Sequence, residues 1–383
     1  MKFLHTADWQ LGMTRRFLGE DAQARYSAAR RDAVASLGAI AAETGAEFVV
    51  VAGDVFEHNQ LAPEVISRSL QAMSAIGVPV YLLPGNHDPL DASSVYTSAL
   101  FTQERPDNVI VLDRPGVWEV RPGVEIVAAP WRSKRPTTDL AAEVLADLPA
   151  DGTVRVLVAH GTVDEVDYSD PDNAAQIGMV GLTAALDRSA VHYVALGDKH
   201  SRTPVGDGGR VWYSGSPEVT NYDDKEPDPG HVLVVNIDET KSAHPVTVES
   251  RTVGRWQFLT RSADLNSAGD VAGLAAMLNA LPHKERTVVR LKLVGTLTVT
   301  DRAALDACLE KHSRLFASVR MWERHTDLAV MPADDEFDDL GISGFAADAV
   351  DELVQTARGD GGDADTARGA LALLMRLRQG GPA

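Results

Sequence analysis

Residues 48–57 read FVVVAGDVFE, an apolar run that stops at a glycine and an aspartate. A short run of β-branched and aromatic residues that ends at a turn is typical of a strand buried on both faces. Four further runs of this kind occur in the first half of the chain: Lys2–Ala7, Pro79–Leu83, Arg155–Ala159 and His192–Leu196. Helical patterns over Ala22–Glu43 and Pro63–Ile76 separate the first three strands, which predicts a layered α/β domain.

Closely spaced strands come next along the chain. The runs Val211–Ser214, His231–Ile237 and Val246–Val253 follow one another without a helical pattern between them. Strands in this arrangement usually pair with each other. We therefore expect them to form a second sheet that packs on the first, which gives an α/β two-sheet sandwich flanked by helices.

The remainder of the chain has a mixed pattern. Helices and strands alternate over Ala268–Ala280, Thr287–Leu293, Asp301–Leu315 and Ser318–Glu323, and Asp301 is placed to cap its helix. Two helical stretches follow, near Ala346–Thr356 and over Thr366–Arg378, on either side of the Gly/Asp-rich hinge Gly359–Asp363. We predict a first domain over residues 1–252, a smaller α+β domain over residues 253–335 and a C-terminal helical tail over residues 336–383.

Composition restricts the class of protein. The chain has 383 residues, which suits two domains and a tail. Cys308 is the only cysteine, so disulfides and a thiolate metal site are excluded. The start at Met1 lacks the layout of a signal peptide and no apolar run is long enough to span a membrane, so we expect a cytoplasmic protein.

The net charge of -19 argues against binding of DNA through the overall field. Nucleic acid would have to be met by local basic loops, by bound metal or by a partner subunit. The alternative is that the acidity is a solubility feature of the source organism.

A polar cluster follows each of the five buried strands predicted in the first half. The clusters are Asp8 and Gln10, then Gly53-Asp54 with Glu57, then Gly85-Asn86-His87-Asp88, then His160, and finally Gly197-Asp198-Lys199-His200. Sites in open α/β sheets form at the carboxyl edge of the strands. We therefore expect these oxygen and imidazole groups to converge.

Such a set of side chains suits a pair of divalent cations. Hydrolysis of a phosphodiester requires a hydroxide nucleophile near neutral pH and neutralisation of the charge on the phosphoryl oxygens, and two cations about 3.5–4 Å apart supply both. Asp, Asn and His are the residues that hold such ions. Each residue taken singly has a simpler reading, as a turn residue or as a hydrogen-bonded core histidine. Their order, with each one at a strand end, favours a shared site.

This order resembles the pattern of the calcineurin-like metallophosphoesterases. That pattern runs Asp-x-His, Gly-Asp-x-x followed by Asp or another polar residue, Gly-Asn-His followed by Asp or Glu, His, and Gly-His-x-His. Within that superfamily, Phe3–Asp8, Val78–Asp88 and Tyr213–Glu218 resemble the SbcD-type DNA exonucleases. The resemblance is specific over residues 1–240 and weakens beyond them. It implies that the α+β unit is a DNA-capping domain and that the tail binds an SbcC-like coiled-coil ATPase.

Carried over residue by residue, the resemblance implies two metal positions that share Asp54 as a bridging ligand. The first position is completed by Asp8, Gln10 and His200, and the second by Asn86, His160 and Asp198. His87 would act as the general acid or polarise the phosphate, and the carboxylate of Glu57 would orient it. The alternative for Glu57 is a solvated acid on a loop.

Two ligands depart from the family pattern. Gln10 and Asp198 stand where the family has histidines. Oxygen in place of imidazole nitrogen makes a site harder, which favours Mn²⁺, with Mg²⁺ as the alternative, over Zn²⁺. The competing reading is that one metal position is weak or lost.

Basic side chains beside the ligand loops are the candidates for phosphate contacts: Arg15, Arg16, Arg132, Lys134, Arg135, Lys199 and Arg202. A solvated surface role is the alternative for each. We expect a metal-dependent DNA nuclease that acts in DNA repair with the SbcC-like ATPase, and a homodimer remains open. The alternatives are a phosphoesterase for small nucleotides or phosphoproteins and a catalytically weakened scaffold subunit.

The last helix is the predicted docking segment for the ATPase. Its apolar residues share one broad face: Ala370, Leu371, Leu373, Leu374 and Leu377. A helix of this length is marginal alone in water and requires a surface to lie against. The alternative is that it folds back on its own domain.

Overall fold

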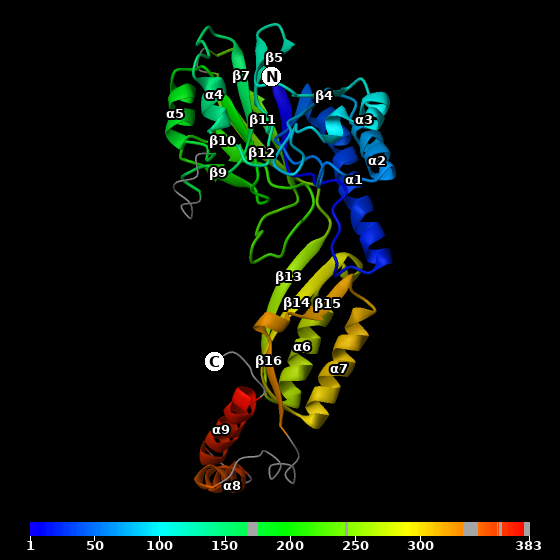
Figure 1. Cartoon of the computed structure of the whole chain (residues 1–383), viewed down its shortest axis with the longest axis vertical. Coiled ribbons are helices and arrows are strands. Elements are labelled where there is room, and N and C mark those ends of the chain that lie inside the picture. The colour runs from blue at the N-terminus through cyan, green and yellow to red at the C-terminus, as the bar shows by residue number, and fades with distance from the viewer. Residues whose placement is uncertain (167–174, 242–243, 332–343, 358, 360–361, 379–383) are drawn as a thin grey trace. The chain divides into compact units, whose positions relative to one another are not determined.

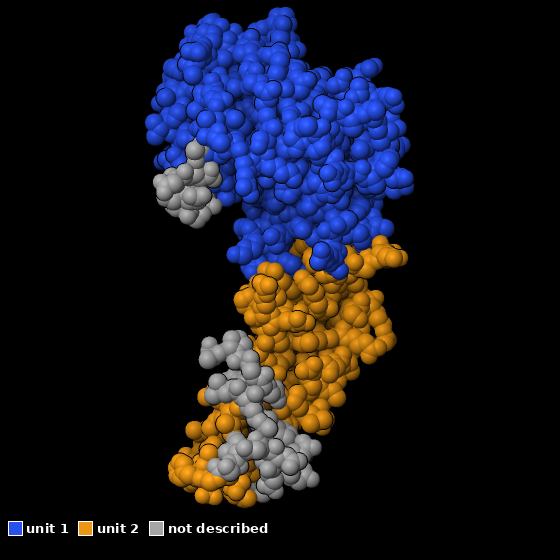
Figure 2. Space-filling model, viewed as in Figure 1, with its two compact units in different colours: residues 1–16, 23–256 blue, residues 17–22, 257–383 orange. Residues whose placement is uncertain are grey.

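The computed structural model describes residues 1–166, 175–241, 244–331, 344–357, 359 and 362–378. It divides into two compact units, residues 1–16 with 23–256 and residues 17–22 with 257–383 (Figure 2). The second unit thus includes a short segment from near the start of the chain, which the sequence did not predict. The predicted tail groups with this second unit.

Two six-stranded sheets make up the first unit (Figure 1). The first sheet, in the order β12-β11-β1-β2-β3-β4, contains β1 (Lys2–Thr6), β2 (Phe48–Val51), β3 (Val80–Leu82), β4 (Val109–Val111), β11 (His231–Ile237) and β12 (Val246–Thr252). The second, in the order β5-β6-β7-β8-β10-β9, contains β5 (Gly116–Arg121), β6 (Val124–Ala129), β7 (Val154–His160), β8 (Tyr193–Gly197), β9 (Thr203–Val205) and β10 (Val211–Tyr213).

The inner faces of the two sheets share one apolar core. Phe3 of β1 stacks on Phe48 of β2 at 5.1 Å and meets the ring of Tyr193 of β8 edge-on at 5.7 Å. Helices cover the outer faces. Those of the first sheet are α1 (Glu20–Thr44), α2 (Pro63–Ser74) and α3 (Ala99–Glu104), and those of the second are α4 (Leu140–Leu145) and α5 (Met179–Asp187). The predicted α/β two-sheet sandwich flanked by helices is confirmed.

The assignment of strands to sheets was wrong in the sequence analysis. β11 and β12 do not form a second sheet but extend the first, because β11 pairs antiparallel with β1, with Lys2 opposite Asn236. β7 and β8, in turn, lie in the second sheet beside β10. Such pairings join residues that are far apart in the chain, so no local pattern reveals them.

The second unit is a parallel sheet with two helices on one face. Its strands are β13 (Gln257–Leu265), the central β14 (Thr287–Thr298), β15 (Ser318–Met321) and β16 (Asp327–Met331), and its helices are α6 (Ala268–Ala280) and α7 (Val299–Ser313). Leu274 of α6 and Leu305 of α7 pack against Leu291 of β14. The cap of α7 is Thr298, whose hydroxyl oxygen accepts the N–H of Asp301 at 3.1 Å, so Asp301 is not the cap as predicted.

The last two helices, α8 (Phe345–Ala357) and α9 (Gly362–Arg378), pack with β16. Leu371 is buried with Val350, Val354 and Ala329, whereas Leu373 is 49% exposed. The predicted apolar face of the last helix is therefore divided between this cluster and solvent, and the side chain of Leu377 lies outside the described residues. α9 also starts inside the predicted hinge, of which residues 360–361 are not described. None of the described helices is both long and apolar enough to cross a membrane.

We expect His5 to make the protein sensitive to acid. His5 is fully buried in β1, with Nδ1 2.9 Å from the Tyr193 hydroxyl, and burial lowers its pKa from 6.5 to about 3. Between these two pH values, the unfolded chain binds a proton at His5 that the folded protein does not bind. The contribution of His5 to the free energy of unfolding is therefore complete above pH 6.5 and is lost as the pH falls. This group should contribute a slope of up to about 1.4 kcal/mol per pH unit to the free energy of unfolding.

Urea unfolding of the wild type and of His5→Gln above and below pH 6.5 measures this slope. The variant should show the shallower dependence on pH. Parallel curves for the two proteins would mean that His5 is protonated in the folded state.

Candidate metal centre

Four of the predicted ligands lie in a backbone conformation that side chains rarely adopt. Asp8, Gln10, Asp54 and Asp198 have φ angles of 53°, 40°, 52° and 102°. Such residues cost about 1–3 kcal/mol each and cluster at functional sites. The N–H of Asp8 donates to the carbonyl of Gly53 at 3.0 Å, and that of Gln10 to the carbonyl of Asp54 at 2.8 Å. These bonds hold the turns after β1 and β2 side by side.

Asp8, Asp54 and His160 form the tightest group of ligand atoms in the described part of the chain. One ligand atom of each lies within 4.8 Å of the other two, and all three residues are buried. They follow or end β1, β2 and β7, so both sheets contribute to the group.

Asn86 and His160 lie on one side of Asp54. Nε2 of His160 is 2.7 Å from Oδ1 of Asn86 and 3.5 Å from Oδ1 of Asp54. Nδ1 of His160 is 2.8 Å from the carbonyl of Ala52, to which it donates its hydrogen. This contact fixes the tautomer that leaves Nε2 available as a ligand.

Gln10 and His200 lie beside Asp8. Nε2 of His200 is 4.0 Å from Oδ1 of Asp8 and 3.3 Å from Nε2 of Gln10. Oε1 of Gln10 is buried and has no hydrogen-bond partner among the described residues. A buried oxygen without a donor is costly, and a hard divalent cation is the partner that suits it. The donor set therefore fits the cation that the sequence predicted here.

Asp198 reaches the centre mainly through its backbone. Its N–H lies 3.1 Å from Oδ1 and 3.2 Å from Oδ2 of Asp8, and its own Oδ2 accepts the Thr162 hydroxyl at 2.7 Å. Neither contact was predicted from the sequence. The structure thus brings Asp198 to the site, with one carboxylate oxygen bound to Thr162.

His87 lies at the more open side of the centre, with 37% of its side chain exposed. Its Nε2 is 3.9 Å from Oδ2 of Asp54, and its main-chain N–H donates to Oδ1 of Asp54 at 2.9 Å. Nδ1 lies 2.9 Å from the main-chain carbonyl of Glu57. The sequence predicted that the carboxylate of Glu57 orients His87, but in the structure the peptide carbonyl makes that contact.

Asp88, the last residue of the Gly-Asn-His-Asp motif, holds the surrounding loops together. Its carboxylate accepts the N–H of Gly85 at 2.8 Å, the N–H of Phe56 at 2.9 Å and the Tyr96 hydroxyl at 2.6 Å. Burial and the charge of Asp54 raise the pKa of Asp88 to about 6. The motif thus includes a structural residue that joins the loops after β2 and β3.

The centre is strongly acidic. Burial raises the pKa of Asp8 to about 7, against the charges of His200 and His160, and Asp54 and Asp198 raise it further. Burial opposes protonation of His160, yet Asp54, Asp8 and Asp198 raise its pKa to about 9. The neighbouring carboxylates thus favour protonation of Asp8 and His160, because their negative charges repel one another. A bound cation would reduce this repulsion in place of the protons.

The basic residues predicted to contact phosphate fall into two sets. Arg16, Arg132, Lys134 and Arg135 are exposed. Three others are less open: Arg15 donates to the carbonyl of Thr220, Arg202 is paired with Asp228 at 2.9 Å, and Lys199 is half-buried. Trp131 starts the loop of the exposed set and donates from Nε1 to the carbonyl of His160 at 2.7 Å. Three exposed cations are therefore on a loop anchored to a predicted ligand.

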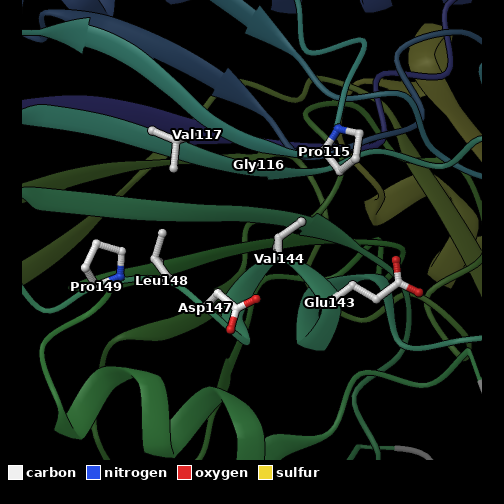
Figure 3. A pocket seen from close by; sticks show the side chains of 8 residues that line it. All are labelled: Pro115, Gly116, Val117, Glu143, Val144, Asp147, Leu148 and Pro149. Atoms are coloured by element: carbon white, nitrogen blue, oxygen red, sulfur yellow. The ribbon is translucent and has the colours of Figure 1, made fainter.

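A separate cavity of about 450 Å³ lies between β5 and α4 (Figure 3). Its lining residues are Pro115, Gly116, Val117, Glu143, Val144, Asp147, Leu148 and Pro149. None of them is a predicted ligand, so this cavity is distinct from the metal centre.

Sequence reasoning missed the residues that support the ligands from behind. Nδ1 of His200 is 2.6 Å from the Thr220 hydroxyl and 3.3 Å from Oε2 of Glu226, and both partners are buried. Arg30 lies buried beneath the turn after β1. The stretch Tyr213–Glu218, noted for its family resemblance, leads into this region and was the one signal that could have directed attention to it.

Comparison with known proteins agrees with this geometry. The model of the calcineurin-like phosphoesterase family matches residues 1–202. The chain is 29% identical to the DNA double-strand break repair protein Mre11 of Archaeoglobus fulgidus over an alignment of 248 residues that covers 59% of this chain and 52% of that protein. It is 35% identical to the SbcD component of the nuclease SbcCD of Bacillus subtilis over 98 residues, 24% of each. The matches thus span about half or less of the length of these curated relatives.

Among solved structures, the chain is similar to a dimetal phosphatase from Danio rerio, with a TM-score of 0.40 and 12% identity over 66% of this chain and 96% of that one. The protein TT1561 of Thermus thermophilus gives a TM-score of 0.40 and 13% identity over 66% of this chain and 98% of that one. Because the family model covers more than half of the sequence, this chain belongs to the calcineurin-like phosphoesterase family.

Proposed function

We propose that this phosphoesterase is a metal-dependent nuclease that hydrolyses phosphodiester bonds in DNA. The observation that carries the proposal is the convergence of Asp8, Asp54 and His160 at the meeting point of the two sheets. The similarity to Mre11, a DNA repair protein by name, and to SbcD, a nuclease component by name, supports DNA as the substrate.

In this proposal Asp54 lies between two cation positions. Asp8, Gln10 and His200 would complete one position, and Asn86 and His160 the other, in line with the distances above. Asp198, whose Oδ2 accepts the Thr162 hydroxyl, would be the third residue of the second position. Two cations held here would supply Lewis acidity at the phosphoryl oxygens and lower the pKa of a water nucleophile. The many oxygen donors favour Mn²⁺ or Mg²⁺.

His87 is the proposed proton donor. Its Nδ1 is held by the carbonyl of Glu57, so Nε2 is the atom that can face a substrate. A protonated Nε2 would donate a hydrogen bond to a phosphoryl oxygen and then transfer its proton to the leaving oxygen. The exposed Arg132, Lys134 and Arg135 would contact flanking phosphates.

A metal-dependent assay on end-labelled DNA, run beside bis-p-nitrophenyl phosphate, tests the proposal. We expect both substrates to be cut in Mn²⁺ and neither in EDTA. Hydrolysis of the small diester without cleavage of DNA would favour a small-molecule phosphoesterase, and metal binding without hydrolysis of either would favour the scaffold alternative.

Asp198 is expected to be a true ligand of the second position. Asp198→Ala should lose one of two ions and most activity, because both a charge and an oxygen donor are removed. Asp198→His should keep two ions and bind softer metals better. Metal analysis of the purified variants decides between these outcomes, and Thr162→Val is the control that removes only the neighbouring hydroxyl. Full occupancy and activity in Asp198→Ala would leave Asp198 as a turn residue.

We further propose a coiled-coil ATPase of the SbcC type as partner. Phe345 of α8 is 88% exposed and Leu373 of α9 is 49% exposed, which are large apolar groups for an acidic surface. Replacing both by serine should abolish co-purification with the ATPase and leave hydrolysis of the small diester unchanged. Deletion of residues 358–383 is the blunter test, because it also uncovers Val350 and Val354. Undiminished binding by the double variant would place the contact elsewhere.

A further inference from the structure

Arg30 is an arginine buried beneath the metal centre. It is 2% exposed, and its guanidinium binds the carbonyls of two separate loops. Nη2 donates to the carbonyl of Trp9 at 2.6 Å and to that of Asp8 at 3.4 Å, while Nη1 donates to the carbonyls of Glu218 and Val219 at 3.2 Å each. Arginine keeps its charge in proteins, so these carbonyls serve as its solvation shell.

The first of these loops is the turn that carries Asp8 and Gln10. Both residues have positive φ, so the turn is under strain and requires support. The hydrogen bonds from Nε and Nη2 to Trp9, at 3.1 Å and 2.6 Å, fix the peptide between the two ligands.

The second loop continues into Thr220, which orients His200. The Thr220 hydroxyl donates to Oε2 of Glu226 at 2.5 Å, so its oxygen accepts the Nδ1 hydrogen of His200 at 2.6 Å. The main-chain N–H of Thr220 donates to Oε1 of Glu226 at 2.8 Å. His200 is thereby held in the tautomer that leaves Nε2 free toward Asp8 and Gln10.

Tyr26 links Arg30 to this second loop. Its hydroxyl accepts a hydrogen bond from Nη1 of Arg30 at 3.0 Å and donates to the carbonyl of Val219 at 2.6 Å. Tyr26 and Arg30 are one turn apart on α1 and therefore share a face. Burial raises the pKa of Tyr26, so the hydroxyl keeps the proton that it donates.

We propose that Arg30 is a positioning residue for the first metal position, because it joins the turn of Asp8 and Gln10 to the loop whose Thr220 orients His200. Arg30 thereby supports the three residues that belong only to the first position, Asp8, Gln10 and His200. The second position receives Asn86, His160 and Asp198 from loops other than the two that Arg30 binds, and it does not depend on Arg30. This inference rests on the two-metal site proposed above.

Arg155 provides a matched control. Its side chain is 3% exposed and it also binds a carbonyl, that of Pro149, but it is paired with Glu125 and Asp151 near the start of β7, whereas His160 ends that strand. Removing a buried arginine from either place should destabilise the fold. Only the substitution of Arg30 should also weaken the binding of one specific ion.

The experiment is a titration of the full chain with Mn²⁺ by calorimetry, with electron paramagnetic resonance of the loaded protein. We expect two ions and an exchange-coupled signal in the wild type and in Arg155→Met. Arg30→Met should bind one ion about 10–100-fold more weakly, as for other residues behind metal ligands, and show the signal of an isolated ion. Thr220→Val should weaken the same ion to a smaller extent, and it serves as the measurement if Arg30→Met does not fold.

Wild-type affinity for both ions in Arg30→Met would overturn the inference, as would an unchanged affinity in Thr220→Val if only that variant folds. Equal weakening of both ions would overturn it too, because the effect would then be general. A wild type that binds fewer than two ions would refute the two-metal site itself, which is a separate outcome.

Discussion

Asp54→Asn should abolish hydrolysis, with a loss on the order of 10³-fold or more, because several kcal/mol of metal-derived stabilisation disappear and each 1.36 kcal/mol is about tenfold in rate. The Asp54 carboxylate lies close to both groups of ligands, with Oδ1 3.5 Å from Nε2 of His160 and a ligand atom within 4.8 Å of one in Asp8. Asparagine keeps the size of the side chain and removes its charge. Both ions should therefore be lost together.

The change in thermal midpoint on addition of Mn²⁺ reports this loss without reference to activity. The wild type should gain stability with metal, by about 2.7 kcal/mol at a concentration 100 times the dissociation constant, and Asp54→Asn should gain none. Asp139→Asn is the control, because Asp139 caps α4 and asparagine caps a helix equally well. If Asp54→Asn retained two ions, Asp54 would not bridge them.

His87→Ala should lower turnover by about 10²–10⁴-fold, the usual contribution of a positioned proton donor. Metal content should stay nearly intact, since Nε2 of His87 lies 3.9 Å from the Asp54 carboxylate and its Nδ1 is bound to the carbonyl of Glu57. Elemental analysis and the rate on bis-p-nitrophenyl phosphate, measured on the same preparation, separate the two effects. A variant that lost its metal along with its activity would identify His87 as a ligand.

Glu57→Gln is the informative companion to His87→Ala. The structure gives the contact with His87 to the peptide carbonyl, which glutamine retains. The rate should then change by less than about tenfold, since no positioned group is removed. A loss as large as that of His87→Ala would restore the carboxylate to the role that the sequence suggested.

The ligand loops could be predicted because each one follows a strand that can be recognised from its own local sequence. Phe48–Val51 is apolar throughout, and the polar residues begin directly after it. The helix α6 was likewise predicted with its observed bounds, since it is rich in Ala and Leu and Ser267 stands at its start as the cap. Local signals sufficed wherever the element and its site residues were neighbours in the chain.

The remaining features depend on contacts between distant residues. The pairing of β11 with β1 places the last two strands of the first unit, β11 and β12, in an unexpected sheet. Glu226, Thr220 and Arg30 carry no motif, and their roles arise only because the fold brings them behind His200 and Asp8. The burial of Leu371 has the same origin. β16 and α8 of the same unit cover it, whereas the docking hypothesis expected another subunit to do so.

The left-handed backbone at Asp8, Gln10, Asp54 and Asp198 also restricts how this protein can evolve or be redesigned. Asn, Asp and His tolerate that conformation better than other side chains, glycine adopts it freely, and β-branched residues are outliers there. Only a small set of residue types therefore suits the backbone at these four positions, whatever their affinity for metal. A designer who wishes to retune the centre for another ion should choose residues from that set, and should note that Gln10 already lies outside it.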